Sequence, residues 1–205
     1  PIGCELAQAF ARMGSRVSII DTGGHLLARE DADAAAIIQN AMLRDGVTLY
    51  LNAKILKTEK RGSEKVVSIG QNGEVAQVAG DDILVGVGRT PNVDGLGLDA
   101  AGIAFDPRMG IQVNDLLRTS NPRVYAAGDC CFQYKFTHTA DALARIVIAN
   151  ALFKSRQKAS SLAIPWCTYT DPEVAHVGMY EKEAQEKGLD VQTLTVQLSD
   201  VDRAL

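Results

Sequence analysis

The sequence predicts an α/β protein with a doubly wound sheet. Apolar residues recur at helical spacing over 2–13 and precede a β-branched run over 16–20. The same order returns as a helical pattern over 32–43 and a strand pattern over 47–51. Alternation of helix and strand is typical of a parallel sheet with helices on its faces. We therefore expect the first half of the chain to form a Rossmann-like unit.

The pattern changes between residues 53 and 87. Gly62 and the pair Asn72-Gly73 stand between β-branched runs, and Asn-Gly in that setting predicts a tight hairpin. We expect an antiparallel β-meander here, followed by one more buried strand over 82–87. The meander strands are expected at 53–60, 65–69 and 74–78.

The composition excludes several classes of protein. The 205 residues are 46% hydrophobic and 22% charged, with a net charge of −4. No run reaches the roughly 18 apolar residues that a membrane span needs. No cluster of lysine or arginine marks a nucleic-acid surface. We therefore expect a globular protein that binds neither nucleic acid nor membrane.

A partial dinucleotide fingerprint stands at the first helix. A complete one reads G-x-G-x-x-G, and Gly3 fits its third glycine, which lets the helix pack closely on the sheet. Asp21 ends the strand pattern over 16–20, where a carboxylate accepts from the ribose 2′-OH of NAD and repels the 2′-phosphate of NADP. Because the first cation after Asp21 is Arg29, we expect NAD rather than NADP. The alternative is that Asp21 only caps a turn.

Two further motifs resemble landmarks of the flavin-dependent pyridine nucleotide-disulfide oxidoreductases. One spans 84–92 and contains Gly88-Arg89, and the other spans 119–129 and ends in Ala-Ala-Gly-Asp. Residues 1–5 resemble the family's G-x-G-x-x-G-x-E helix, and 169–178 resemble the opening of its dimerisation domain. The family includes dihydrolipoamide dehydrogenase, glutathione reductase, mercuric reductase and the soluble transhydrogenase.

The resemblance implies three parts in an internal fragment of a longer flavoenzyme. These are an NAD(P)-binding domain without its first strand (1–90), the returning segment of an FAD domain (91–158) and the start of an α+β dimerisation domain (163–205). The redox C-x-x-x-x-C pair would precede the chain and the catalytic His-Glu couple would follow it, so no catalytic residue is expected within it. We expect the fragment alone to be inactive and to bind no stoichiometric FAD, and the whole protein to be a cytoplasmic homodimer.

The resemblance also implies residues of the NAD site. Glu5 resembles a glutamate that pairs with a lysine near the flavin, although a carboxylate in a first helical turn also interacts with the macrodipole. Gly88 resembles a glycine beside the nicotinamide, and Arg89 is expected to fix the crossing between domains. The expected NAD contacts are Ile2, Gly3, Glu5, Asp21, Ile55 and Gly88, with Ile55 at the adenine end.

The FAD site is implied by the second half of the chain. Asp129 resembles the aspartate that hydrogen-bonds a ribityl hydroxyl. Phe136, Thr137 and His138 precede a helix predicted over 140–153, whose start would face the flavin and stabilise negative charge on the reduced ring. The same helix also fits plain core packing. The Thr-His-Thr-Ala sequence departs from the Ala-His-Lys-Ala of dihydrolipoamide dehydrogenases, which argues against lipoamide as the substrate.

The cysteines and histidines predict no metal site. Mercuric reductases carry a vicinal cysteine pair at the extreme C-terminus, whereas Cys130 and Cys131 follow the flavin aspartate, so we expect them to be structural thiols. The three histidines lack metal-ligand spacing.

Three functions remain open. The first is transfer of a hydride from NAD(P)H through FAD to a redox disulfide, and then to a disulfide, a thiol-bound group or a metal ion. The second is a flavin NADH dehydrogenase or nucleotide transhydrogenase of the same fold without that disulfide. The third is a non-catalytic NAD-binding module. Fold alone does not decide between them.

Overall fold

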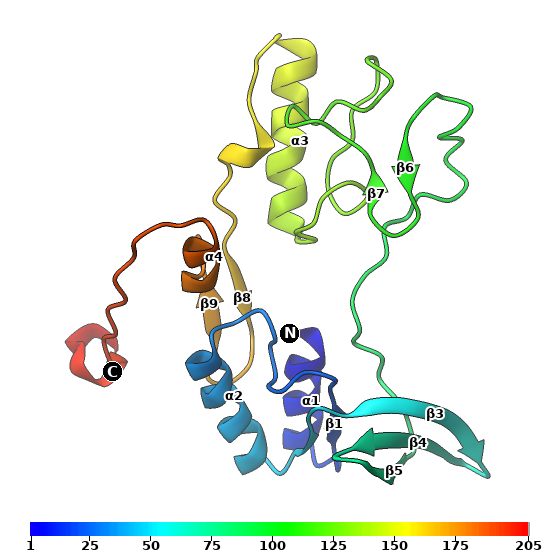
Figure 1. Cartoon of the computed structure of the whole chain (residues 1–205), viewed down its shortest axis with the longest axis vertical. Coiled ribbons are helices and arrows are strands. Elements are labelled where there is room, and N and C mark those ends of the chain that lie inside the picture. Colours follow the sequence, from blue (N-terminus) through cyan, green and yellow to red (C-terminus); the bar gives the residue numbers. More distant parts are fainter. Residues whose placement is uncertain (205) are drawn as a thin grey trace.

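The computed structural model describes residues 1–204 and begins with the predicted α/β unit. Helix α1 (Ile2–Arg12), strand β1 (Ser18–Ile20), helix α2 (Ala32–Arg44) and strand β2 (Thr48–Tyr50) follow one another (Figure 1). The two strands pair in parallel, with Ile19 opposite Leu49. The predicted alternation of helix and parallel strand is therefore confirmed.

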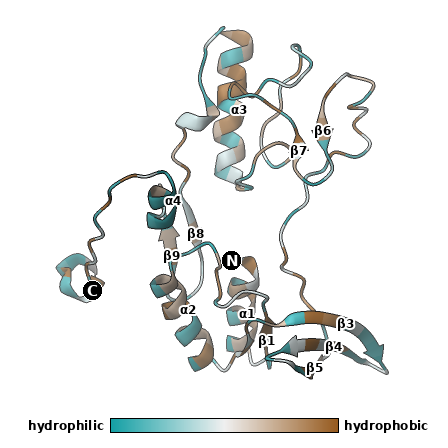
Figure 2. Cartoon of the chain, in the orientation of Figure 1, coloured by the Kyte–Doolittle hydropathy of each residue, from teal (hydrophilic) through white to brown (hydrophobic). Residues whose placement is uncertain are grey.

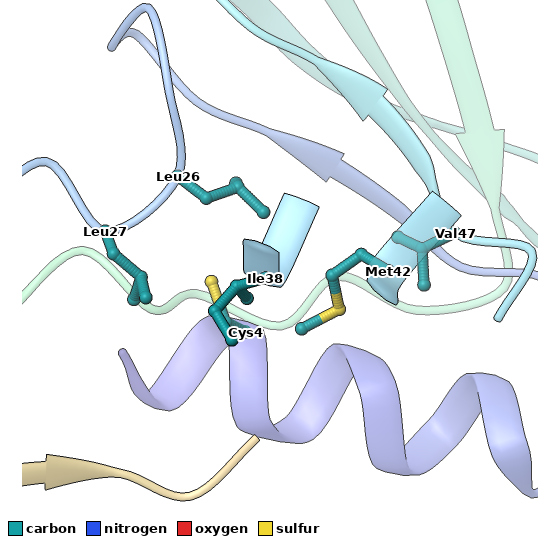
Figure 3. Packing of buried hydrophobic residues seen from close by; sticks show 6 residues of the cluster. All are labelled: Cys4, Leu26, Leu27, Ile38, Met42 and Val47. Atoms are coloured by element: carbon teal, nitrogen blue, oxygen red, sulfur yellow. The ribbon is translucent and has the colours of Figure 1, made fainter. Parts of the chain in front are cut away.

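The core of this unit joins both helices to the loop between β1 and α2. Figure 3 shows side chains from α1, the loop and α2 pointing toward one another. Ile38 and Met42 of α2 are fully buried, and Cys4 of α1 is 7% exposed. Burial of large apolar side chains stabilises such a unit by roughly 1.5–3 kcal/mol each. The cluster consists of Cys4, Leu26, Leu27, Ile38, Met42 and Val47.

The predicted meander is also confirmed. Strands β3 (Lys54–Arg61), β4 (Glu64–Gln71) and β5 (Glu74–Gly80) form an antiparallel sheet with β4 in the centre. Asn72 and Gly73 have φ of +53° and +83°, the left-handed pair that a tight hairpin turn requires. Figure 2 shows hydrophilic residues on β3, which is an edge strand, and charge on an edge opposes pairing with another chain.

The strand predicted over 82–87 is wrong. This segment runs from β5 toward the second half of the chain and pairs with no strand among residues 1–204. Its apolar side chains face solvent, with Leu84 51% and Val87 86% exposed. An apolar run becomes a strand only where a neighbour supplies hydrogen-bond partners, and in the described part of the chain β1 pairs with β2 alone.

The second half packs short strands and loops against one long helix. Strands β6 (Phe105–Asp106) and β7 (Gly110–Ile111) pair in antiparallel fashion, and helix α3 (Thr137–Leu152) begins three positions before the predicted Ala140. The motif over 119–129 forms no strand, and Tyr125 makes a single bridge to Arg118. Figure 2 shows hydrophobic residues along α3, and its predicted core role is confirmed by a cluster of Leu117, Leu143, Ile146 and Ala159.

The remaining residues form a small α+β segment. Strands β8 (Trp166–Thr168) and β9 (Val174–His176) pair in antiparallel fashion, and helix α4 (Glu181–Glu186) follows. Short 3₁₀ turns lie at Ala159–Ser161, Leu198–Asp200 and Asp202–Ala204. Of the helices in residues 1–204, none has both the length and the apolar character that a bilayer crossing demands.

Candidate functional site

The first turn of α1 lies against the segment that carries Gly86. A Cβ added to Gly86 would stand 3.3 Å from the Cα of Gly3, so a side chain there would crowd the helix. Close approach at a helix start is the role of the third glycine in a dinucleotide fingerprint. Ile2 opens the helix and is 46% exposed. Gly88 has a φ of +112°, and the space where its Cβ would point is open.

Asp21 stands at the carboxyl end of β1, where the sequence places it. Its N–H donates to the carbonyl of Tyr50 at 2.9 Å, and its own carbonyl accepts from the N–H of Ala53 at 3.0 Å. The carboxylate Oδ1 accepts from the N–H of Gly23 at 2.7 Å, so it closes the turn after β1. Because a carboxylate has two oxygens and about four acceptor sites, this cap is compatible with binding a ribose hydroxyl.

Ile55 lies near the same strand end. It follows Ala53 by two positions in the chain, and it pairs with Ile69 across the meander. Its side chain is 51% exposed. The start of β3 is therefore anchored beside Asp21, and the contact of Ile55 with an adenine stays a prediction.

Asp129 lies on the loop before α3, and its side chain is 48% exposed. The guanidinium of Arg89 reaches this loop: its Nη1 is 3.7 Å from Asp129 Oδ2 and also donates to the carbonyl of Lys135. Lys135 Nζ in turn donates to the carbonyl of Asp129 at 3.0 Å. Arg89 thus connects the end of the predicted NAD(P)-binding domain to the predicted FAD loop.

Two glycines let this loop pack closely. Gly128 has a φ of +81°, and a Cβ there would stand 3.1 Å from the Cβ of Ala140 on α3. A Cβ on Gly110 would collide with the carbonyl oxygen of Cys130 at 2.2 Å. The loop that presents Asp129 is therefore held between β7 and α3.

Phe136, Thr137 and His138 form the start of α3, as the site prediction requires. Phe136 is the N-cap residue, and its ring stacks on that of His138 with centroids 5.4 Å apart. His138 Nε2 donates to the carbonyl of Pro165 at 2.8 Å. In the same turn, the buried Oγ1 of Thr139 has no hydrogen-bond partner in residues 1–204.

Sequence reasoning missed the junction around Trp166. Its ring stacks on Phe136 at 6.1 Å and on Tyr134 at 5.6 Å, so it contacts the predicted flavin-facing turn. Its Nε1 donates at 2.9 Å to Oε1 of Glu30, which is 8% exposed, and the hydroxyl of Tyr180 donates to the other oxygen of Glu30 at 2.9 Å. Burial, together with the Glu30 carboxylate, raises the pKa of Tyr180 above its usual range. The only signal in the sequence is a single tryptophan.

The four cysteines are free thiols. The Cys130 thiol donates to the carbonyl of Ala127 at 3.4 Å and the Cys131 thiol to that of Gly128 at 3.5 Å. Burial, with a smaller contribution from Cys130, raises the pKa of Cys131 to about 12. These features favour the predicted structural role. Across residues 1–204, no three His, Cys, Asp or Glu side chains converge as metal ligands.

Comparison with known proteins identifies the family. The family model described as pyridine nucleotide-disulphide oxidoreductase matches residues 1–144, and the model of its dimerisation domain matches residues 164–205. The chain is 35% identical over 204 residues to a mercuric reductase of Lysinibacillus sphaericus and 35% identical over 184 residues to a dihydrolipoyl dehydrogenase of Bacillus subtilis. The alignments cover 100% and 90% of this chain, but only 37% and 39% of those relatives.

Solved structures agree with this result. The HOCl-induced flavoprotein disulfide reductase RclA from Escherichia coli superimposes with a TM-score of 0.84 at 30% identity, over 98% of this chain and 46% of that one. LpdA from Mycobacterium tuberculosis gives a TM-score of 0.87 at 28% identity, over 99% of this chain and 44% of that one. The predicted α/β fold and the predicted resemblance are confirmed. The chain belongs to the pyridine nucleotide-disulphide oxidoreductase family.

Proposed function

We propose that this chain is part of an FAD-dependent oxidoreductase that passes a hydride from NAD(P)H through flavin to a redox disulfide. The observation that carries the proposal is the short segment from Gly86 to Arg89. Gly86 packs on Gly3 at the start of the nucleotide helix, and Arg89 reaches Asp129 on the flavin loop. Three residues span at most about 11 Å. The segment therefore connects the start of the nucleotide helix to the flavin loop, which supports hydride transfer between the two predicted cofactor sites.

Family membership implies FAD and a pyridine nucleotide as the cofactors, and the residues present fit both. Asp21 is placed to orient the ribose of NAD, and the start of α1 at Gly3 offers N–H groups to the pyrophosphate. Asp129 is exposed on its loop for a ribityl hydroxyl. Within residues 1–204 the start of α3 has no side-chain cap, so its free N–H groups fit a helix end that meets an acceptor-bearing ring.

These residues would bind and orient the two cofactors and stabilise negative charge on the reduced flavin. When bound, FAD supplies the ring that accepts the hydride. The start of α3, where Thr137 and His138 lie, favours negative charge in front of it through the helix dipole. Asp21 favours NADH because a 2′-phosphate would meet its negative charge. Gly88 keeps the space beside the nicotinamide open.

The substrate and the assembly are part of the proposal. We place this protein among cytoplasmic homodimers whose electron acceptor is a disulfide, a thiol-bound group or a metal ion. The match of residues 164–205 to a dimerisation domain supports the dimer, and similarity to mercuric reductases and dihydrolipoyl dehydrogenases supports this range of acceptors.

Anaerobic reduction of the full-length protein tests the function. We expect a flavin spectrum, bleaching by NADH at lower concentrations than NADPH, and two additional thiols per protomer after reduction. Flavin reduction with no new thiols would favour the NADH dehydrogenase or transhydrogenase alternative. Nucleotide binding by a protein that contains no flavin would indicate a non-catalytic NAD-binding module and contradict the proposal.

A further inference from the structure

One face of α1 carries three polar residues that all reach the loop between β8 and β9. Glu5, Gln8 and Arg12 are spaced three and four positions apart, so they lie one above another on the helix. Glu5 Oε1 accepts from the N–H of Tyr169 at 2.9 Å, and Arg12 Nη1 donates to Oδ2 of Asp171 at 2.7 Å. The loop belongs to the segment that matches the dimerisation domain, whereas α1 begins the nucleotide unit.

Gln8 is the centre of this contact and is 4% exposed. Its Oε1 accepts from the N–H of Asp171 at 2.7 Å, and its Nε2 donates to the carbonyl of the same residue at 2.8 Å. The amide thus holds both backbone groups of one loop residue. Nε2 also donates to Oδ2 of Asp45 at 2.8 Å, and Arg12 Nε donates to that same oxygen at 2.8 Å. Asp45 therefore restrains the side chains of both Gln8 and Arg12.

We infer that Gln8 is a positioning residue for Glu5 and that it acts through the backbone of the loop. This inference rests on the proposed function and on the predicted place of Glu5 near the flavin. The Glu5 carboxylate is held by the N–H of Tyr169, and the position of that N–H depends on Asp171 two residues later. The dimerisation segment thereby completes the nicotinamide side of the site. Gly3 and Glu5 share the first turn of α1, so this restraint begins where the nucleotide is expected.

Two readings of the contact make different predictions. If the contact only stabilises the packing of α1 on the loop between β8 and β9, loss of Gln8 lowers the unfolding temperature and leaves the rate of hydride transfer unchanged. If it positions Glu5, loss of Gln8 slows hydride transfer in the same way as loss of the Glu5 charge, because small misplacements of a site residue cost large factors in rate.

The test uses stopped-flow reduction of flavin by NADH in the full-length protein, with thermal unfolding measured in parallel. Gln8→Met keeps the size of the side chain and removes its hydrogen bonds. We expect it to slow flavin reduction at saturating NADH by about tenfold or more, and we expect the same of Glu5→Gln. Asn150→Leu is the matched control. Asn150 is also a buried helical amide with three backbone hydrogen bonds, to Leu116 and Gln157, so its loss lowers the unfolding temperature without slowing reduction.

A second pair of variants covers failure of Gln8→Met to fold. Arg12→Gln removes an exposed contact to the same loop and is expected to slow flavin reduction less, but in the same direction. Its control is Arg145→Gln, which removes an exposed ion pair with Asp141 on α3. Normal reduction rates in the Gln8 and Arg12 variants, or in Glu5→Gln, overturn the inference. Wild-type flavin that NADH fails to reduce overturns the proposed function instead.

Discussion

The indole N–H of Trp166 donates to the buried carboxylate of Glu30, although 136 residues of sequence separate them. Glu30 ends the loop that starts after Asp21, and Trp166 stacks on Phe136 at the start of α3. The hydrogen bond therefore links the predicted NAD ribose loop to the predicted flavin-facing turn through the first strand of the C-terminal segment.

Removal of the Glu30 carboxylate should destabilise this junction. Glu30→Ala leaves the Trp166 and Tyr180 donors without their acceptor, which costs about 2–4 kcal/mol of unfolding free energy. We expect a lower thermal midpoint and red-shifted tryptophan emission. Glu30→Gln keeps one acceptor oxygen, so it should lower the unfolding free energy less than Glu30→Ala does. The exposed Glu186 provides the control Glu186→Ala, and equal stability losses in the two alanine variants would contradict the role of the junction.

Substitution of Asp21 should change the choice of nucleotide. Asp21→Asn removes the charge that opposes a 2′-phosphate and weakens the bond to the ribose, so we expect the Kd for NADH to rise by about tenfold. The preference for NADH over NADPH should fall. Titration with both nucleotides measures this, and an unchanged ratio of the two affinities would leave Asp21 as a turn cap alone.

Gly128 should be intolerant of a side chain. Gly128→Ala adds strain at a φ of +81° and a contact 3.1 Å from the Cβ of Ala140, which together cost about 1–3 kcal/mol and displace the loop of Asp129. We expect weaker FAD retention during gel filtration. Gly188→Ala is the control, because Gly188 also has a positive φ of +69° but open space around the added Cβ. An equal drop in FAD retention in both variants would mean that backbone strain at a positive φ causes the effect and that the contact with Ala140 does not contribute.

Acid should loosen the contact between α1 and the loop at Asp171. Hydrogen bonds from Arg12 and then Gln8 lower the pKa of Asp45 in the folded protein. A lowered folded pKa contributes stability above the ordinary carboxyl range, and this stability is lost as the pH falls through the folded value. The protection factor of the Asp171 amide, which compares its exchange rate with the intrinsic rate at the same pH, should therefore fall below about pH 4. In Asp45→Asn this extra acid sensitivity should disappear; its persistence would assign the effect to another carboxyl.

The sequence predicts the local elements well because their signals are local. Helical spacing, the β-branched runs over 16–20 and 47–51 and the Asn72-Gly73 turn each depend on neighbouring residues, and these predictions are confirmed. The segment 82–87 shows the limit of that reasoning. Its apolar pattern is that of a buried strand, but strand formation depends on a neighbour, and none among residues 1–204 pairs with it.

In the candidate site, too, features that depend on local sequence are predicted and those that depend on distant partners are not. Asp21 stands at the end of β1 and the turn at Phe136 opens α3, as their motifs predict, and Asp129 lies on the loop before that helix. Glu30 and Gln8 were missed because their partners are more than a hundred residues away in sequence. In a single sequence, a polar residue in a helix or loop predicts a solvated surface, and only the tertiary fold shows that it is buried and shared.

The shielding of the neighbouring thiols has a consequence for electron flow. Burial raises the pKa of Cys131 to about 12, so at pH 7 this thiol stays protonated and seldom forms the thiolate, which is the form that attacks disulfides and electrophiles. A thiol that is so seldom deprotonated reacts slowly with disulfides. Cys131 can thus lie two positions after the predicted flavin ligand without offering reducing equivalents a side route or alkylating agents a reactive thiolate.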